Sequence, residues 1–300
     1  RAWMAEFKTP FFRSYLMNQP DLIKTVLKTR PNDFPKSDRI GEGLRPLLGN
    51  SVFLTNGETW KRQRRIIDPA FEGGRLRDTF PAMWDAAEAA AERLGTREGQ
   101  VVEIEAETSH AAADVIFRTL FSIPIDHHLA RDVFDEFKTY QRSQPILNIA
   151  AFIPLPRWLP RIFRRDTRSS AAKIRQLITT LTEDRMAKIK DGTAPSDLAT
   201  KIMTTVDPVD GDTFTTQEMV DQVAIFFLAG HETSASALAW TLYLMATHPE
   251  WQDRLAQEAQ QIDACDFSVM SKLRLSRDVF RKALRLYPVA PVAGFSCRNG

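Results

Sequence analysis

An apolar segment in the second half of the chain contains side chains that could do chemistry. Residues 226–240 read FFLAGHETSASALAW, so that polar residues interrupt an apolar run. In a helix, Ala229, Gly230 and Thr233 share one face, where a bulky group could approach the backbone. Thr233 can donate its hydroxyl to a carbonyl one turn back or to a ligand, and a buried Glu232 needs a partner, a proton or a water channel. The same letters also fit a core helix with a satisfied polar patch that packs closely against another helix.

A second segment, ETWKRQRRIIDPAF, offers groups that suit an anion. Trp60 and Arg64 are four residues apart and share a helix face. An indole N–H beside a guanidinium suits a carboxylate. Lys61, Arg62 and Arg65 lie elsewhere on this helix. An equally simple interpretation is that all four cations are solvated.

Helical periodicity dominates the chain, so helices must position both segments. The apolar spacing predicts helices over 20–29, 58–67, 79–95, 108–122, 127–142, 167–191, 197–205, 217–248, 250–262 and 276–287. Two short pieces, SVFL at 51–54 and QVVEIEA at 100–106, have the pattern of strands. The segment 144–165 is rich in proline and apolar residues and breaks the helical rhythm. The sequence therefore predicts one mostly α domain over 1–300, with a small β element.

The helix over 217–248 has clear boundaries. Thr215 followed by Glu218 is the pattern of a capping box at its start, and Pro249 ends it. A helix of this length spans about 48 Å at 1.5 Å per residue. Since it is apolar on most sides, we expect it to run through the middle of the domain.

Bulk composition excludes some classes of protein. The 300 residues are 43% hydrophobic and 26% charged, with a formal net charge of +2, which is ordinary for a globular protein and lacks the basic excess of a nucleic-acid binder. Two cysteines are too few for a disulfide framework, which favours a reducing, cytoplasmic location. No apolar run reaches the roughly 18 residues that span a bilayer. Membrane contact is therefore expected to be peripheral at most, through the stretch RWLPRIFRR.

Four segments together resemble the cytochrome P450 family of haem-thiolate monooxygenases, in the order and approximate spacing of that family. They are Trp-x-x-x-Arg at 60–64 followed by DPAF, AGHETS at 229–234, THPEWQDRLAQEA at 247–259 and LRLYP at 284–288. The resemblance covers essentially the whole chain and implies a partial cytochrome P450 fold of the soluble, bacterial type. It implies a haem-dependent monooxygenase that inserts one atom of dioxygen into a hydrophobic organic substrate.

The resemblance gives the motif residues expected roles. Haem contacts are implied at Trp60, Arg64, Ala229, Gly230, Thr233 and Arg298. Of these, Trp60, Arg64 and Arg298 are expected to bind the haem propionates. Glu232 and Thr233 are expected to manage the protons of dioxygen activation as the catalytic pair. A polar island in an apolar helix would then serve to bring dioxygen, water and protons together.

The resemblance also implies partners. Electrons are expected to come ultimately from NAD(P)H through a ferredoxin- or flavodoxin-like donor, which a basic surface at Lys61, Arg62 and Arg65 would steer. His231 occupies a variable position of the motif and is expected to have no catalytic role. The substrate pocket would draw on 39–53, 140–160, Phe226 and 289–295. These segments are largely apolar, so a hydrophobic substrate is expected.

The chain departs from the family in two places. The haem-ligating cysteine of the family lies in a Phe-x-x-Gly-x-x-x-Cys-x-Gly loop, and neither Cys265 nor Cys297 has that context, so we expect truncation before the loop. The Glu-x-x-Arg of the family is here Lys282 followed by Arg285, two like charges. Breaking a buried ion pair costs about 3–5 kcal/mol. The alternative interpretation is therefore a catalytically inactive relic of the fold, either a pseudoenzyme or a binder of apolar ligands; an unrelated helical scaffold with a basic patch is a third.

Overall fold

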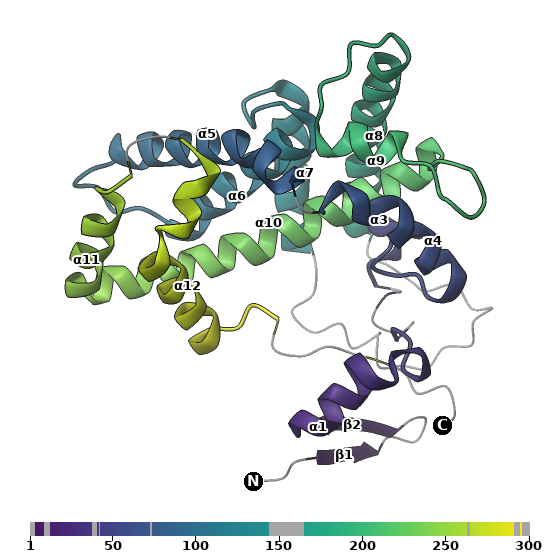
Figure 1. Ribbon diagram of the computed structural model, residues 1–300, viewed down its shortest axis with the longest axis horizontal. Helices are drawn as coiled ribbons and strands as arrows, with labels where there is room; N and C mark the ends of the chain where they lie inside the picture. Colours follow the sequence, from purple (N-terminus) through teal and green to yellow (C-terminus); the bar gives the residue numbers. More distant parts are fainter. Residues whose placement is uncertain are drawn as a thin grey trace.

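A mostly helical chain surrounds one long helix, α10. The computed structural model describes residues 4–8, 13–37, 41, 43–72, 74–143, 165–262, 265–290 and 295. Helices account for most of this part, and Figure 1 shows them arranged along and across α10. Strands occur in the described residues as one antiparallel pair, apart from an isolated bridge between Lys36 and Phe295. The expectation of a mainly α fold with a small β element is confirmed.

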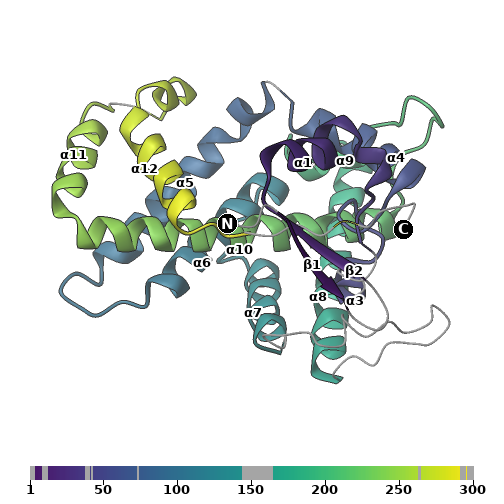
Figure 2. The ribbon, with the colours of Figure 1, turned by 90° about the horizontal axis from the view of Figure 1, so that it is seen from below.

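The long helix α10 runs from Thr216 to Thr247 and crosses the molecule (Figures 1 and 2). Its predicted capping box is confirmed. The backbone N–H of Glu218 donates to the hydroxyl of Thr215 at 3.2 Å, and the Glu218 carboxylate accepts the backbone N–H of Thr215 at 2.9 Å. These bonds satisfy N–H groups that a helix start otherwise leaves without partners. Pro249 begins the next helix, α11 (Pro249–Ala259).

Apart from one short helix at residues 45–48, which the sequence did not predict, the remaining helices of the described chain fall close to the predicted ranges. They are α1 (Pro20–Lys24), which continues as a π-helical turn at Thr25–Thr29, α3 (Arg45–Leu48), α4 (Gly57–Ile67), α5 (Arg75–Gly95), α6 (Ile104–Phe121), α7 (His128–Ser143), α8 (Arg165–Lys190), α9 (Leu198–Thr204) and α12 (Arg274–Leu286). Helices α6 and α8 pack along α10, while α5 packs on α6 and α7 on α8. Figure 2 shows α11 and α12 at the C-terminal end of α10, with α4, α8 and α9 nearer its start.

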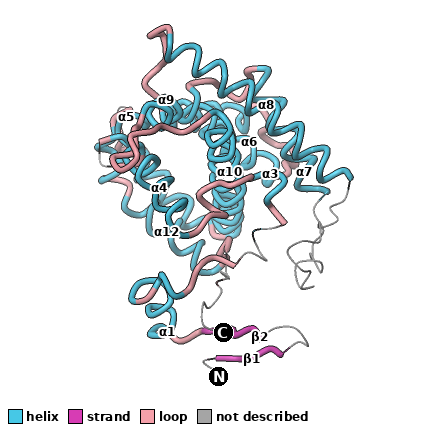
Figure 3. The backbone as a smooth tube through the Cα atoms, turned by 90° about the vertical axis from the view of Figure 1, so that its right-hand side faces the viewer, coloured by secondary structure: helices cyan, strands magenta, loops and turns pink. Residues whose placement is uncertain are grey.

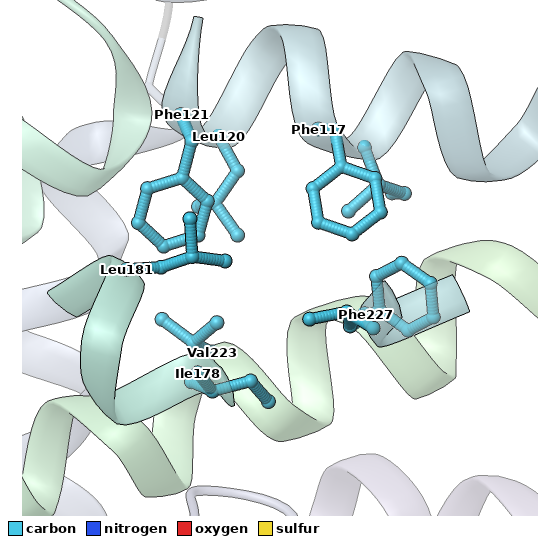
Figure 4. A pocket seen from close by; sticks show the side chains of 9 residues that line it. Phe117, Leu120, Phe121, Ile178, Leu181, Val223 and Phe227 are labelled. Carbon is cyan, nitrogen blue, oxygen red and sulfur yellow. The ribbon is translucent and has the colours of Figure 1, made fainter. Parts of the chain in front are cut away.

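The core lies where α6, α7, α8 and α10 meet. The ring of Phe227 on α10 lies 5.1 Å from that of Phe117 on α6 and 4.3 Å from that of Phe137 on α7, between centroids. Beside these rings, the apolar side chains drawn in Figure 4 leave a void of about 10 Å³. A void of that size holds at most one water molecule. This region is therefore packed core, and it positions the middle of α10.

The β element lies at the N-terminal end of the chain, contrary to the sequence prediction. Strand β1 (Met4–Lys8) pairs antiparallel with β2 (Arg13–Met17), and both lie with α1 apart from the main helices (Figures 1 and 3). The predicted strand at 51–54 is a turn, and in the stretch 100–106 the last three residues begin α6. The prediction of a strand at 51–54 was wrong. The segment is apolar because Leu54 is buried in the core, although the backbone forms a turn and pairs with no strand of the described chain.

Candidate functional site

Two cations from different segments approach the indole of Trp60 on α4. The guanidinium of Arg64 lies 5.9 Å from the centroid of the Trp60 ring, and the Lys36 Nζ atom lies 5.4 Å from it. Arg64 also forms an ion pair with Asp68 at 2.8 Å, one turn along the same helix. Trp60 and Arg64 are exposed. The predicted pairing of Trp60 with Arg64 on one face is therefore present, and Lys36 is an additional member.

Lys36 lies close to Arg64 without a carboxylate partner in the described part of the chain. Its ammonium donates to the backbone carbonyls of Val52 at 2.6 Å and Thr55 at 3.2 Å. Burial, together with the positive charge of Arg64, lowers the pKa of Lys36 to about 8. An anion bound here would offset the repulsion between the two cations. Sequence reasoning missed Lys36 because it lies outside α4, and no local pattern links it to Trp60.

The loop that carries the carbonyl partners of Lys36 is held by buried polar groups of α10. The Asp221 carboxylate accepts the backbone N–H of Asn50 at 2.7 Å, and the Gln222 side chain accepts that of Val52 at 2.9 Å. Gly49 precedes them with φ of 51°, and a Cβ atom there would lie 2.2 Å from an Asp221 carboxylate oxygen. Only glycine combines this conformation with this approach. The loop is therefore fixed relative to α10, and it in turn holds Lys36. We call Lys36, Trp60 and Arg64 the cation cluster.

The middle of α10 shows one predicted contact and one unexpected one. The hydroxyl of Thr233 donates to the backbone carbonyl of Ala229 at 2.6 Å, as predicted for a threonine one turn on. Ala229 and Thr233 are exposed. At Gly230, an added Cβ atom would lie 2.4 Å from Cδ1 of Ile116 on α6. Ile116 thus fills the space that a side chain at position 230 would need. On that side of α10, the close approach predicted for a bulky ligand is a contact between two helices.

Glu232 and His231 point to different neighbours of α10. The Gln141 side-chain amide on α7 donates to the exposed Glu232 carboxylate. His231 is buried, with its Nε2 atom 2.7 Å from the Ser109 hydroxyl of α6. Its ring stacks on Phe227 with centroids 5.3 Å apart, and burial lowers its pKa to about 4. His231 is therefore neutral at physiological pH, and its contacts to α6 and to Phe227 help to fix α10.

A cavity of about 380 Å³ lies against the small residues of α10. Residues from α10, α6, α5, α9 and the turn after α4 line it: Phe226, Ala229, Gly230, Val115, Ile116, Thr119, Leu120, Thr79, Met83, Leu198, Ala70 and Phe71. Its walls are mainly apolar, and the rings of Phe71 and Phe226 meet edge to face with centroids 5.8 Å apart. Within the described residues, no hydrogen bond, ion pair or ring contact joins Trp60 or Arg64 to Glu232 or Thr233. The two predicted groups of residues therefore do not contact each other directly in the described structure.

The basic surface predicted on α4 is mostly neutralised. Arg62 pairs with Asp210 at 2.7 Å and with Glu218 at 2.8 Å. Arg65 pairs with the buried Asp207 at 2.6 Å, and this guanidinium lowers the pKa of Asp207 to about 2. Lys61 pairs with Glu58 on its own helix. Arg62 and Arg65 are thus paired with acids from the loop before α10 and from its first turn, which α4 alone does not reveal. The role of this surface in steering a partner stays a prediction.

The structure shows the surroundings of the residues that depart from the family pattern near the C-terminal end of the chain. Lys282 and Arg285 are both exposed on α12, and neither forms an ion pair with a described residue. Among the described residues the two like charges are three positions apart on an exposed face, where their repulsion costs a few tenths of a kcal/mol. Cys265 is exposed before a short 3₁₀ helix. Arg298, Cys297 and most of the segment 144–165 lie outside the described residues.

These features define a class: an α-helical protein with a long central helix that carries a small-residue and acid–threonine motif, and a cation cluster that suits carboxylates. The sequence profile of cytochrome P450 matches residues 8–294. The chain belongs to the cytochrome P450 family. None of its described helices is both long enough and apolar enough to cross a membrane.

Known proteins similar to the chain come from plants and bacteria. It is 29% identical over 281 residues to a cytokinin hydroxylase of Arabidopsis thaliana, which covers 91% of this chain and 54% of that protein. It is 33% identical over 288 residues to a cyclooctat-9-en-7-ol 5-monooxygenase of Streptomyces melanosporofaciens, with coverage of 92% and 59%. The crystal structure of the cytochrome P450DA haem domain superposes with a TM-score of 0.76 at 20% identity, over 94% of this chain and 62% of that one. The chain thus spans between half and two thirds of the length of these proteins.

Proposed function

We propose that this protein is a haem-dependent monooxygenase that acts on a hydrophobic organic substrate, with residues 1–300 forming part of a single catalytic domain. The observation that carries the proposal is the cation cluster on α4, in a chain of the cytochrome P450 family. Lys36 and Arg64 flank one indole, and Lys36 has no acid partner among the described residues. Such a cluster is unfavourable alone and favourable around carboxylates.

The described residues fit part of a haem. Guanidinium, ammonium and indole N–H groups are suitable donors for the two propionates, and Arg298 is proposed as a further donor. On α10, the exposed Ala229 and the neighbouring Gly230 are small enough to lie against a flat macrocycle. Cys265, the one cysteine among the described residues, is exposed and lies outside the loop pattern in which the family carries its haem-ligating cysteine. The proposal therefore assigns the propionate side and one face of the haem to this chain.

Bound haem supplies the redox chemistry that activates dioxygen. The residues of this chain bind, orient and handle protons. Glu232 is exposed on α10 and carries a carboxylate able to take up and release a proton. The Thr233 hydroxyl, which now donates to the carbonyl of Ala229, can instead donate to an acceptor beside the helix. We assign proton delivery to these two neighbouring side chains.

The substrate and the electron donor follow from the same proposal. The apolar walls of the 380 Å³ cavity support a hydrophobic substrate. Electrons would come from NAD(P)H through a ferredoxin- or flavodoxin-like partner. Arg62 and Arg65 are already paired with acids, so the proposed docking of that partner does not depend on free charges at these two residues.

Haemin and its dimethyl ester test the proposal, since the ester lacks the two carboxylates. Each is titrated into the protein while the Soret absorbance and the tryptophan fluorescence are recorded. We expect haemin to bind more tightly than the ester, by about tenfold for each charge-assisted contact of about 1.4 kcal/mol. Lys36→Met and Arg64→Met should each reduce that preference. The share due to Lys36 should decline as the pH rises above about 8, where the lysine of the unliganded protein loses its proton.

Lys61→Met is the matched control, because Lys61 is an exposed cation next to Trp60 in sequence that pairs with Glu58. Its preference for haemin over the ester should equal that of the unmodified protein. Equal affinity for haemin and ester in the unmodified protein would contradict the proposal. So would an effect of Lys61→Met as large as that of Arg64→Met.

A second candidate is a catalytically inactive relic of the fold, which Lys282 favours. Lys282 stands where the family has an acid, and Arg285 has no acid partner among the described residues. A relic that binds apolar ligands would retain the cavity and show no preference between haemin and its ester. The titration above therefore separates the two candidates.

A further inference from the structure

We infer that Gln141, near the end of α7, is a positioning residue for Glu232, an inference that rests on the proposed proton-carrying role of Glu232. The side-chain amide of Gln141 donates to one carboxylate oxygen of Glu232. In the described part of the chain, this is the one hydrogen bond that the carboxylate makes. Glu232 is exposed, whereas Gln141 is partly buried, so the amide is the more firmly placed of the two groups.

The backbone beneath Glu232 is fixed by its neighbour His231. The His231 ring bonds Ser109 on α6 and meets the Phe134 ring of α7 edge to face, with centroids 5.6 Å apart. These contacts on two helices set the rotation of α10 about its axis. With that rotation fixed, Glu232 lies next to the last turn of α7, and its remaining freedom is that of its own side chain. A long, exposed side chain loses this freedom only when a partner holds it.

Tyr140 shows that α7 offers a second donor close to the same carboxylate. Its hydroxyl is buried and has no hydrogen-bond partner among the residues that the structure describes. Burial, with the negative charge of Glu232 as a second cause, raises the pKa of Tyr140 to about 12. The hydroxyl therefore keeps its proton at physiological pH. Of these two α7 side chains, Gln141 is the one bonded to the carboxylate, whereas the phenol of Tyr140 is not.

The consequence is that α7 controls where the proposed proton carrier points. The amide holds one oxygen of Glu232 on the α7 side of α10, next to a threonine whose hydroxyl is turned back to its own helix. Proton transfer needs donor and acceptor within hydrogen-bond reach. An amide that fixes the carboxylate without competing for its proton serves this purpose better than a cation, which would hold the carboxylate in its charged form.

Carbon NMR on the protein labelled with ¹³C at the glutamate carboxyl groups tests the inference. The Glu232 resonance is identified as the one that disappears in Glu232→Gln. Gln141→Met keeps the length of the side chain and removes the donor, and Gln141→Asn keeps the amide but shortens its reach. We expect both variants to move the Glu232 resonance by more than its line width. Gln176→Met, the same change at an exposed glutamine on α8, should leave it in place.

Thermal unfolding of each variant controls for stability, since a purely structural role would lower the melting temperature without displacing one resonance. A Glu232 resonance that stays in place in both Gln141 variants would overturn the inference. The haemin titration involves neither residue, so it can fail or succeed separately. If the resonance is displaced but haemin and its ester bind equally, the contact between Gln141 and Glu232 is supported and the proposed function is contradicted.

Discussion

Individual residues gain their chemistry here from neighbours that are distant in sequence. Trp60 and Arg64 share a helix face, but the character of their site depends on Lys36, which reaches them from outside α4. Likewise, Glu232 is exposed on a helix whose preceding half is mostly buried, and its hydrogen-bond partner comes from α7. The types of these residues are visible in the sequence, whereas their environments are properties of the fold.

His231 gives a prediction at the scale of one residue. Its pKa is lowered from 6.5 to about 4 by burial, so the unfolded chain binds a proton between these values that the folded chain does not. The stability from neutral His231 is therefore complete above pH 6.5 and is lost as the pH falls toward 4. His231→Phe should cost about 1 kcal/mol near pH 7 through loss of the bond to Ser109.

As the pH falls from 7 to 4.5, the stability of the His231→Phe protein should decline less steeply than that of the unmodified protein. Urea unfolding at several pH values measures the difference. Parallel declines in the two proteins would show that His231 does not titrate on unfolding.

The motif residues could be predicted from the sequence because spacing on a helix is a local property. Thr233 bonds the carbonyl of Ala229, as the spacing of four residues predicts. What occupies the space beside Gly230 could not be predicted. A glycine next to a ligand and a glycine next to a side chain such as Ile116 look the same in a sequence. The pairing of Arg62 and Arg65 was missed for a related reason: their acids lie in the loop before α10, far along the chain.

At the scale of elements, the link between α10 and the loop before α4 joins the two parts of the proposed site. Asp221 and Gln222 on α10 bond the backbone of this loop, and Lys36 bonds two of its carbonyls. Arg175 of α8 donates to the same Asp221 at 2.6 Å. Buried charges with several partners are costly to disturb. The loop should therefore be among the stable parts of the fold.

Two glycines of similar backbone conformation allow a matched test of this link. Gly49→Ala introduces a Cβ atom at 2.2 Å from Asp221, at a φ of +51°. Gly57→Ala introduces one at a φ of +64° with no atom within 4 Å. We expect about 3 kcal/mol or more of lost stability for Gly49→Ala and about 1–2 kcal/mol for Gly57→Ala. Urea unfolding checks both, and equal losses would mean that Asp221 does not fix the loop.

Helices could be predicted from the sequence more fully than strands. The range 217–248 matches α10 closely because caps and apolar periodicity are local signals. The pairing of β1 with β2 could not be found in this way, since most residues of both strands are exposed and show no alternation of buried and exposed side chains. The turn at 51–54 was mistaken for a strand because a buried apolar turn has the same composition.

At the scale of the whole molecule, one long helix connects the cation cluster to the acid–threonine motif. The loop before α4 is bonded to the first half of α10, and Glu232 and Thr233 follow toward its middle. In the proposed function, a haem bound to this chain of the cytochrome P450 family would contact both α4 and α10. We propose that these elements belong to a haem protein in which a cysteine thiolate ligates the iron, as the resemblance to the family implies.

The absorbance spectrum of the protein purified from its native source, reduced and exposed to carbon monoxide, tests this claim most directly. We expect a Soret band strongly shifted to the red, as a thiolate ligand produces. Haem without that shift, or no haem band at all, would contradict it.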